Sequence, residues 1–248
     1  MKALWAFALW ALSFAAQAAT VEVEIYDRAS GSTLPVHGFE GKAYVAGEPG
    51  HEYELVLRNR SGGRVLAVTS VDGVNVITGE TASPGQSGYV LAPYGSVTIS
   101  GWRKSMEEVA AFYFTRHSNS YAARTGRPFD VGVIGVAVFE EKRQCCEWFG
   151  AREKDGLDDG AAEAPASAAP EGQSRRAESP KLGTGHGRRE QSGASYTEFE
   201  RATDAPQSIV AVYYDTRANL VARGILPAPR EYARRQPRPF PGAFVPDP

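Results

Sequence analysis

The sequence predicts a mainly all-β protein, a β-sandwich of about eight strands with Greek-key or jelly-roll-like connections. Three observations support this prediction: apolar residues alternate with polar ones, turn residues recur about every ten positions, and the most apolar runs are short. About 120 residues with this pattern suit one sandwich, and a closed barrel is the alternative. We expect a small C-terminal strand-strand-helix unit to pack on the sandwich.

Residues 1–18 are predicted to form a secretory signal peptide. Lys2 is followed by an apolar run, and the small residues Ala16 and Ala18 precede the expected cleavage site. The run is shorter than the roughly 20 residues that a membrane span requires, which favours a cleaved signal over an anchor. We predict cleavage after Ala18, a periplasmic or secreted location, and no transmembrane segment in the mature chain.

The predicted sandwich domain covers residues 19–149. The segment "TVEVEIYD" alternates like a half-exposed strand, and two further strands around Leu55 and at Val65–Val71 are separated by a Ser-Gly-Gly turn. The Asp72-Gly73 pair between apolar runs predicts a tight hairpin, because both central positions of that turn need positive φ. Each of these segments fits a sheet with one buried face.

The later part of this domain holds its most apolar runs. After the short strands in "YVLAP" and "SVTIS", the runs "VAAFYFT" and "DVGVIGVAVFEE" are expected to be central strands. The intervening "SNSYAARTGRP" predicts one or two helical turns with a capping Ser. Ser105 and Glu108 fit a capping box, which predicts a helical turn between two strands.

The rest of the chain divides into three predicted regions. Residues 150–180 are rich in Ala, Pro, Gly, Ser and charge, which is typical of a disordered linker. Residues 181–226 are expected to form a strand at "SYTEFERA", a strand at "SIVAVYYD" and a helix that Gly224 ends. Residues 227–248 form a Pro-rich basic tail that favours extended conformation.

The charge and the motifs exclude several classes of function. The chain carries a formal net charge of −2, whereas a nucleic-acid-binding protein needs a basic field. Its 4 histidines show no metal-ligand spacing, and no nucleophile elbow is present. We therefore predict no metal, no cofactor, no catalytic residue and no nucleic-acid partner, and lean against an enzyme; the oligomeric state stays open.

The two cysteines, Cys145 and Cys146, are adjacent in the sequence. An exported protein meets an oxidising compartment, yet neighbouring cysteines are poorly placed for the usual disulfide geometry. A strained disulfide between them and an intermolecular bridge are candidate states. The alternative is a pair of free thiols.

Three adjacent residues, Trp102, Arg103 and Lys104, are candidate ligand-binding residues. They fall at one end of the predicted sandwich, where loops usually carry binding residues. A Trp beside cations can stack on a sugar or peptide and attract an acidic group. The structural alternative is that Trp102 closes the core and Arg103 pairs with a carboxylate. If other loops gather at that end, the further candidates are Asp72, Asn75, His117 and Asn119.

The segment "LGTGHG" is a candidate anion-binding loop. Gly183, Gly185 and Gly187 allow close backbone approach, and amides beside His186 could hold an anion. A phosphate loop normally lies between a strand and a helix, whereas this segment follows the linker. The alternative is a glycine-rich segment that resumes the fold after the linker.

The segments "VDGVNVITGE", "GYVLAP", "LGTGHGRRE" and "VYYDTRANLVARGI" together resemble a group of uncharacterised exported bacterial proteins. The resemblance implies no activity, but it implies that the segment after the linker belongs to the same folded unit. We predict a non-catalytic binding or interaction protein of the periplasm or cell envelope, with an envelope protein or glycan as partner. The alternatives are a hydrolase of an envelope polymer and a purely structural envelope component.

Overall fold

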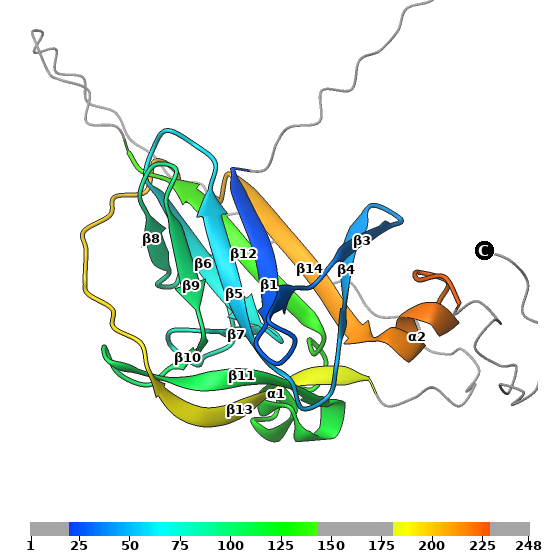
Figure 1. The fold of residues 1–248 in the computed structure, drawn as a ribbon. Coiled ribbons are helices and arrows are strands. Elements are labelled where there is room, and N and C mark those ends of the chain that lie inside the picture. The colour runs from blue at the N-terminus through cyan, green and yellow to red at the C-terminus, as the bar shows by residue number, and fades with distance from the viewer. Residues whose placement is uncertain (1–19, 143–180, 229–248) are drawn as a thin grey trace, which may run out of the picture.

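The computed structural model describes residues 20–142 and 181–228, and it confirms the predicted β-sandwich. Two seven-stranded sheets pack against each other around one main core (Figure 1). The predicted signal peptide (1–18), the linker (150–180), Cys145, Cys146 and all but the start of the tail (227–248) lie outside the described residues. None of the helices in the described ranges is long and apolar enough to cross a membrane.

The two sheets draw strands from the whole length of the chain. The first sheet contains β1 (Val21–Asp27), β2 (Ser32–Thr33), β5 (Glu52–Asn59), β9 (Ser96–Ile99), β10 (Gly101–Arg103), β11 (Glu108–Arg116) and β13 (Leu182–Gln191). The second sheet contains β3 (Val36–Phe39), β4 (Lys42–Gly47), β6 (Val65–Val71), β7 (Val74–Asn75), β8 (Tyr89–Leu91), β12 (Val133–Glu140) and β14 (Ser208–Thr216). The short helices are η1 (His117–Asn119), α1 (Tyr121–Arg124) and α2 (Arg217–Ala222).

Local sequence signals explain many of these elements. Buried residues alternate with more exposed ones along β1, as its sequence predicts. Asp72 and Gly73 adopt φ values of 51° and 70°, which confirms the predicted hairpin turn between β6 and β7. Ser120 caps α1 by accepting a hydrogen bond from the Ala123 amide, so the predicted short helix is also present.

The turn between β10 and β11 differs from the predicted helical turn. Ser105 Oγ accepts hydrogen bonds from the amides of Glu107 and Glu108, as a capping residue would. The Lys104 amide donates to the Glu108 carbonyl at 2.9 Å, which closes a hairpin instead of starting a helix. The predicted hydrogen bonds to the Ser105 side chain are therefore present, but the backbone that they stabilise is a hairpin turn and not a helical turn.

The C-terminal strands complete the sandwich by joining both of its sheets. β13 pairs with β11 in the first sheet, and β14 lies between β4 and β12 in the second. The predicted strand at "SYTEFERA" is wrong, since that segment holds only an isolated bridge between Glu141 and Arg201. The first C-terminal strand is instead the glycine-rich segment at Leu182–Gln191.

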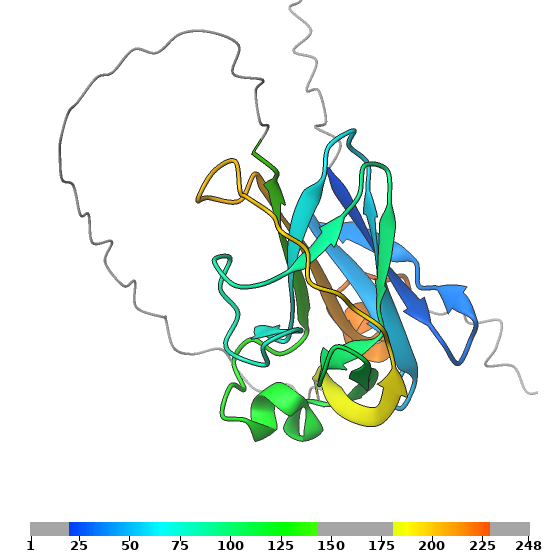
Figure 2. The same ribbon diagram turned by 90° about the vertical axis from the view of Figure 1, so that its left-hand side faces the viewer.

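A long connection joins β13 to β14 because these strands belong to different sheets. Residues 192–207 run outside the edge of the sandwich that carries β8 and β9 (Figure 2). We call residues 192–201 the strap. At one end the amides of Ser192 and Ala194 donate to the β10–β11 turn, and at the other the amide of Lys142 donates to the Glu200 carbonyl. The strap is therefore held at both ends.

Candidate functional site

A groove of about 830 Å³ lies between the strap and strands β8, β9 and β10. Its aliphatic lining comes from both sheets, and from the β10–β11 turn. These aliphatic residues are Leu66, Ile77, Val90, Val97 and Met106. Ile77 and Val97 also pack against the main core, and Val90 packs against a smaller cluster on the second sheet. The groove therefore opens where the core reaches the edge of the sandwich.

Three cations also line the groove, Arg103 and Lys104 from the strand side and Arg201 from the strap. Asp and Glu are absent from the described residues that line it. Tyr89 contributes an aromatic ring, and Tyr196, which is 92% exposed, stands on the strap. The groove thus combines an apolar surface, positive charge and aromatic rings.

Arg103 connects the strap to the strands. Its guanidinium donates to the carbonyl oxygen and the hydroxyl of Ser192 on the strap, and to the Tyr89 hydroxyl at 3.0 Å on β8. The same group lies 5.8 Å from the centre of the Tyr89 ring. A planar guanidinium with several donors can bridge partners in this way. In the structural alternative Arg103 would pair with a carboxylate, whereas its side chain donates to neutral oxygens of Ser192 and Tyr89.

Trp102 faces away from the groove. It is 3% exposed, and its ring lies 5.1 Å from Phe112 in an edge-on contact and 5.0 Å from Tyr121. Neighbouring residues on a strand point to opposite faces, so Arg103 reaches the groove while Trp102 enters the core. The burial of Trp102 supports the alternative in which its side chain closes the core.

Asp72 and Asn75 are fully buried and cannot form an open cleft with the groove cations. Asp72 accepts hydrogen bonds from the Gly132 amide at 2.8 Å, the Thr184 amide at 2.7 Å and the Tyr214 hydroxyl. Burial raises the pKa of Asp72, while these hydrogen bonds act in the opposite direction. The network links both sheets, because Thr184 belongs to β13 and Tyr214 to β14.

Asn75 organises the loop that borders the groove. Its side-chain amide donates to Gln86 and to the Ser87 carbonyl at 3.1 Å, and its oxygen accepts from the Ile77 amide at 2.8 Å. Gln86, Ser87 and Ile77 all line the groove. Asn75 is thus a positioning residue for the groove wall.

His117 and Asn119 lie in η1, and neither lines the groove. His117 Nε2 donates to the Pro128 carbonyl at 2.8 Å, and Asn119 is exposed. The structure therefore brings together only Arg103 and Lys104 of the candidate ligand residues. The residues that sequence reasoning missed are Tyr89, Ser192, Tyr196 and Arg201. No local pattern distinguishes them from other surface residues.

The anion-loop interpretation of Gly183, Gly185, His186 and Gly187 is corrected, because these residues form part of β13. A Cβ atom on Gly185 would lie 2.2 Å from the Tyr113 ring, and one on Gly183 would lie 2.6 Å from Val131. Close packing of neighbouring side chains therefore accounts for these two glycines. Burial lowers the pKa of His186, and nearby cations such as Lys104 lower it further.

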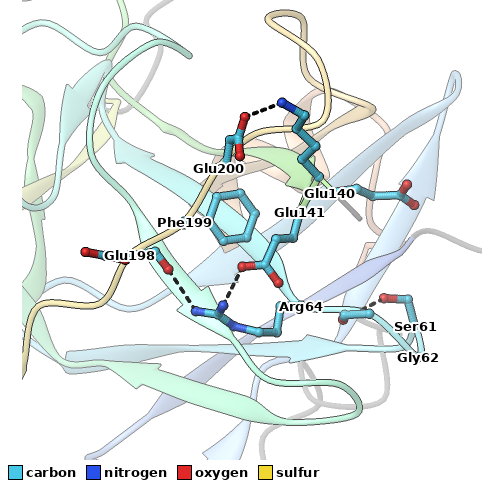
Figure 3. A pocket seen from close by; sticks show the side chains of 10 residues that line it. Ser61, Gly62, Arg64, Glu140, Glu141, Glu198, Phe199 and Glu200 are labelled. Carbon is cyan, nitrogen blue, oxygen red and sulfur yellow. Dashed lines mark hydrogen bonds and ion pairs between the residues drawn. The ribbon is translucent and has the colours of Figure 1, made fainter. Parts of the chain in front are cut away.

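A second pocket, of about 740 Å³, lies beside the far end of the strap (Figure 3). Arg64 forms an ion pair with Glu141, and Lys142 forms one with Glu200. Both cations that line this pocket are thus neutralised by glutamates, unlike those of the groove. Nowhere in residues 20–142 and 181–228 do three or more His, Cys, Asp or Glu side chains gather as metal ligands.

Comparison of the chain with protein-family models, with curated proteins and with solved structures found no match. The function is therefore proposed from the geometry of the chain's own residues.

Proposed function

We propose that this chain is an exported, non-catalytic binding protein of the bacterial periplasm or cell envelope, and that the groove is where its partner binds. The groove itself is the observation that carries the proposal. Its volume of about 830 Å³ is within the range of roughly 300–1,000 Å³ that is usual for ligand pockets. It is built on the rigid edge of two sheets, with one side closed by a strap that is held at both ends.

The polar groups of the groove support binding rather than catalysis. Arg103 and Arg201 donate to neutral oxygens, and Arg201 also lies 4.2 Å from the centre of the Phe139 ring. These contacts fix the cations in place. Hydrolysis of a glycosidic bond in an envelope polymer usually uses a pair of carboxyl groups, and the described lining of the groove contains none.

Site-specific photo-crosslinking in the native envelope would test this proposal. A benzophenone amino acid replaces Tyr196, which is 92% exposed on the strap, or Phe129, which is 91% exposed and outside the groove. We expect a discrete adduct from position 196 and none from position 129. The full-length chain is expressed with its own leader, and the mass of the recovered protein shows whether residues 1–18 were removed.

A groove-filling variant makes the result specific. Thr98→Trp places a large ring in the groove from an exposed position on β9, whereas Ser96→Trp adds the same ring on the same strand outside the lining. The adduct from position 196 is expected to disappear in Thr98→Trp and to persist in Ser96→Trp. Equal adducts in both variants, or an equal yield from position 129, would exclude the groove as the binding site.

A further inference from the structure

Among the described residues, none of the three cations that line the groove forms an ion pair with a carboxylate. Several cations beside the first sheet are matched by carboxylates: Arg28 pairs with Glu190 at 2.7 Å, and Arg188 pairs with Glu52 at 2.9 Å. In the groove, by contrast, Lys104 is exposed, and its side-chain ammonium group has no hydrogen-bond or ion-pair partner in the described part of the chain. The groove is therefore a site of positive charge on a chain whose net charge is −2.

Two unpaired strand edges border the groove. Among the strands of residues 20–142 and 181–228, β8 pairs only with β6, and β9 pairs only with β5. Tyr89 and Val90, whose side chains point to opposite faces of β8, both line the groove, as do Val97 and Thr98 of β9. A groove that touches both faces of a strand must run along its edge.

The strap leaves these edges available. Within the described residues, no backbone hydrogen bond joins residues 192–201 to β8 or β9. The contact on this side is made by side chains, such as Arg201 donating to the Gln86 carbonyl at 2.8 Å. The backbone donors and acceptors along the outer edge of β8 can therefore pair with another chain, which is how β-strand addition works.

We propose that the groove binds an extended acidic polypeptide segment, with alternating apolar and acidic residues, by strand addition at the edge of β8. This inference rests on the proposed function and specifies its ligand. On a strand added to β8, side chains at every second position are about 7 Å apart, and the apolar set would lie on the Val90 face, against Val90 and Leu66. The acidic side chains between them would lie on the Tyr89 face, where the Tyr89 hydroxyl accepts a hydrogen bond from Arg103, and would interact with Arg103 and Lys104. An unpaired strand edge favours a polypeptide over an acidic glycan, because a glycan has no backbone amides to pair.

Fluorescence anisotropy with synthetic eight-residue peptides tests the inference on the mature chain. The probes alternate Val with Glu, Val with Gln or Val with Lys, and a fourth probe carries N-methyl groups on alternate residues of the Val-Glu peptide. A sulfated heparin fragment serves as the acidic glycan. We expect the Val-Glu peptide to bind best, the Val-Lys peptide not to bind, and N-methylation to weaken binding at least tenfold.

Two charge variants separate a specific contact from general attraction. Lys104→Glu is expected to weaken binding of the Val-Glu peptide about fivefold, from the reversal of one charge at a partly solvated distance. Lys181→Glu makes the same change at an exposed position at the opposite end of β13, and it should leave binding unchanged. Raising the salt concentration from 0.05 to 0.5 M should weaken the wild-type complex and narrow the gap between wild type and Lys104→Glu.

Several outcomes would overturn the inference. Equal binding of the Val-Gln and Val-Glu peptides would show that negative charge is not recognised. Equal binding of the Val-Glu peptide and its N-methylated form would exclude strand addition as the mode of binding. Binding of the heparin fragment alone would indicate a glycan. If no peptide binds while the Tyr196 adduct persists, the acidic-peptide inference fails and the proposed function stands.

Discussion

The substitution Asp72→Asn tests whether the buried hydrogen-bond network holds the two sheets together. Asn, like Asp, tolerates the positive φ of 51° at this turn, so the backbone is not strained by the change. The carboxylate accepts three hydrogen bonds, two on Oδ1 and one on Oδ2. An amide has only one oxygen, so either orientation of Asn leaves at least one buried backbone N–H facing an NH₂ group.

The magnitude follows from the groups that lose their acceptor. An unsatisfied buried donor costs about 1–3 kcal/mol, and Asn leaves at least one buried backbone N–H without an acceptor, with its own NH₂ group facing that N–H. We expect the free energy of unfolding to fall by about 2–4 kcal/mol. With a urea m-value of about 2 kcal/mol/M, the midpoint should shift by roughly 1–2 M.

The pH dependence has a defined sign. Burial raises the pKa of Asp72 in the folded protein, so the folded state binds this proton more tightly than the unfolded chain. The stability that Asp72 gains from this tighter proton binding is fully present below the unfolded pKa of about 3.9, and it is lost as the pH rises through the pKa of Asp72 in the folded protein. The advantage of wild type over Asp72→Asn should therefore be largest in acid and decrease above about pH 4. The other carboxylates titrate alike in both proteins, so their effect on stability cancels when the two unfolding free energies are subtracted.

The assay is urea unfolding followed by far-UV circular dichroism, repeated from pH 3.5 to 7. Asp204→Asn is the matched control, because Asp204 is exposed and outside the buried network. This control should stay within about 0.5 kcal/mol of wild type. A value for Asp72→Asn inside the same margin, at every pH, would refute a stabilising role for the network.

Two further predictions concern packing and acid stability. Gly101→Ala would place a Cβ 2.0 Å from a backbone oxygen of β11. We therefore expect the free energy of unfolding in urea to fall by about 1–3 kcal/mol. The control is Gly193→Ala, whose Cβ would meet nothing within 4 Å and which should leave that free energy unchanged. Burial opposes ionisation of Asp27, but hydrogen bonds from His51 and backbone amides leave its pKa lowered. The stability it provides is present above about pH 3.9 and lost in stronger acid. Asp27→Asn should thus lower the Tm at pH 6 and have no effect near pH 2, and a constant difference would contradict this.

Much of the fold could be predicted because its signals are local. The Asp72-Gly73 turn is readable from two residues, since few other pairs adopt positive φ at both positions. β13 could not be read in the same way. Glycines disfavour strands in general, and Gly185 is required here by the Tyr113 ring of β11, which lies on the other side of the linker in sequence. A tertiary contact, invisible in the local pattern, determines that strand.

The candidate site was predictable only in part, for a similar reason. "GWRK" contains the information that Trp102 and Arg103 point to opposite faces of a strand, so at most one of them could line an open site. Which one faces the core depends on Phe112 and Tyr121. Arg201 reaches the groove because the chain passes back along the edge of the sandwich after β13. The residues next to Arg201 in the sequence do not predict that path.

The groove is a consequence of how the C-terminal strands are distributed. β13 pairs with the first sheet and β14 with the second, so the chain between them must pass from one sheet to the other. It passes along the edge where β8 and β9 each have one partner, and Arg103 fixes it there through Ser192. β13 and β14 also supply Thr184 and Tyr214 to the buried hydrogen-bond network around Asp72. The segment after the linker therefore contributes both to the core that stabilises the sandwich and to one wall of the groove.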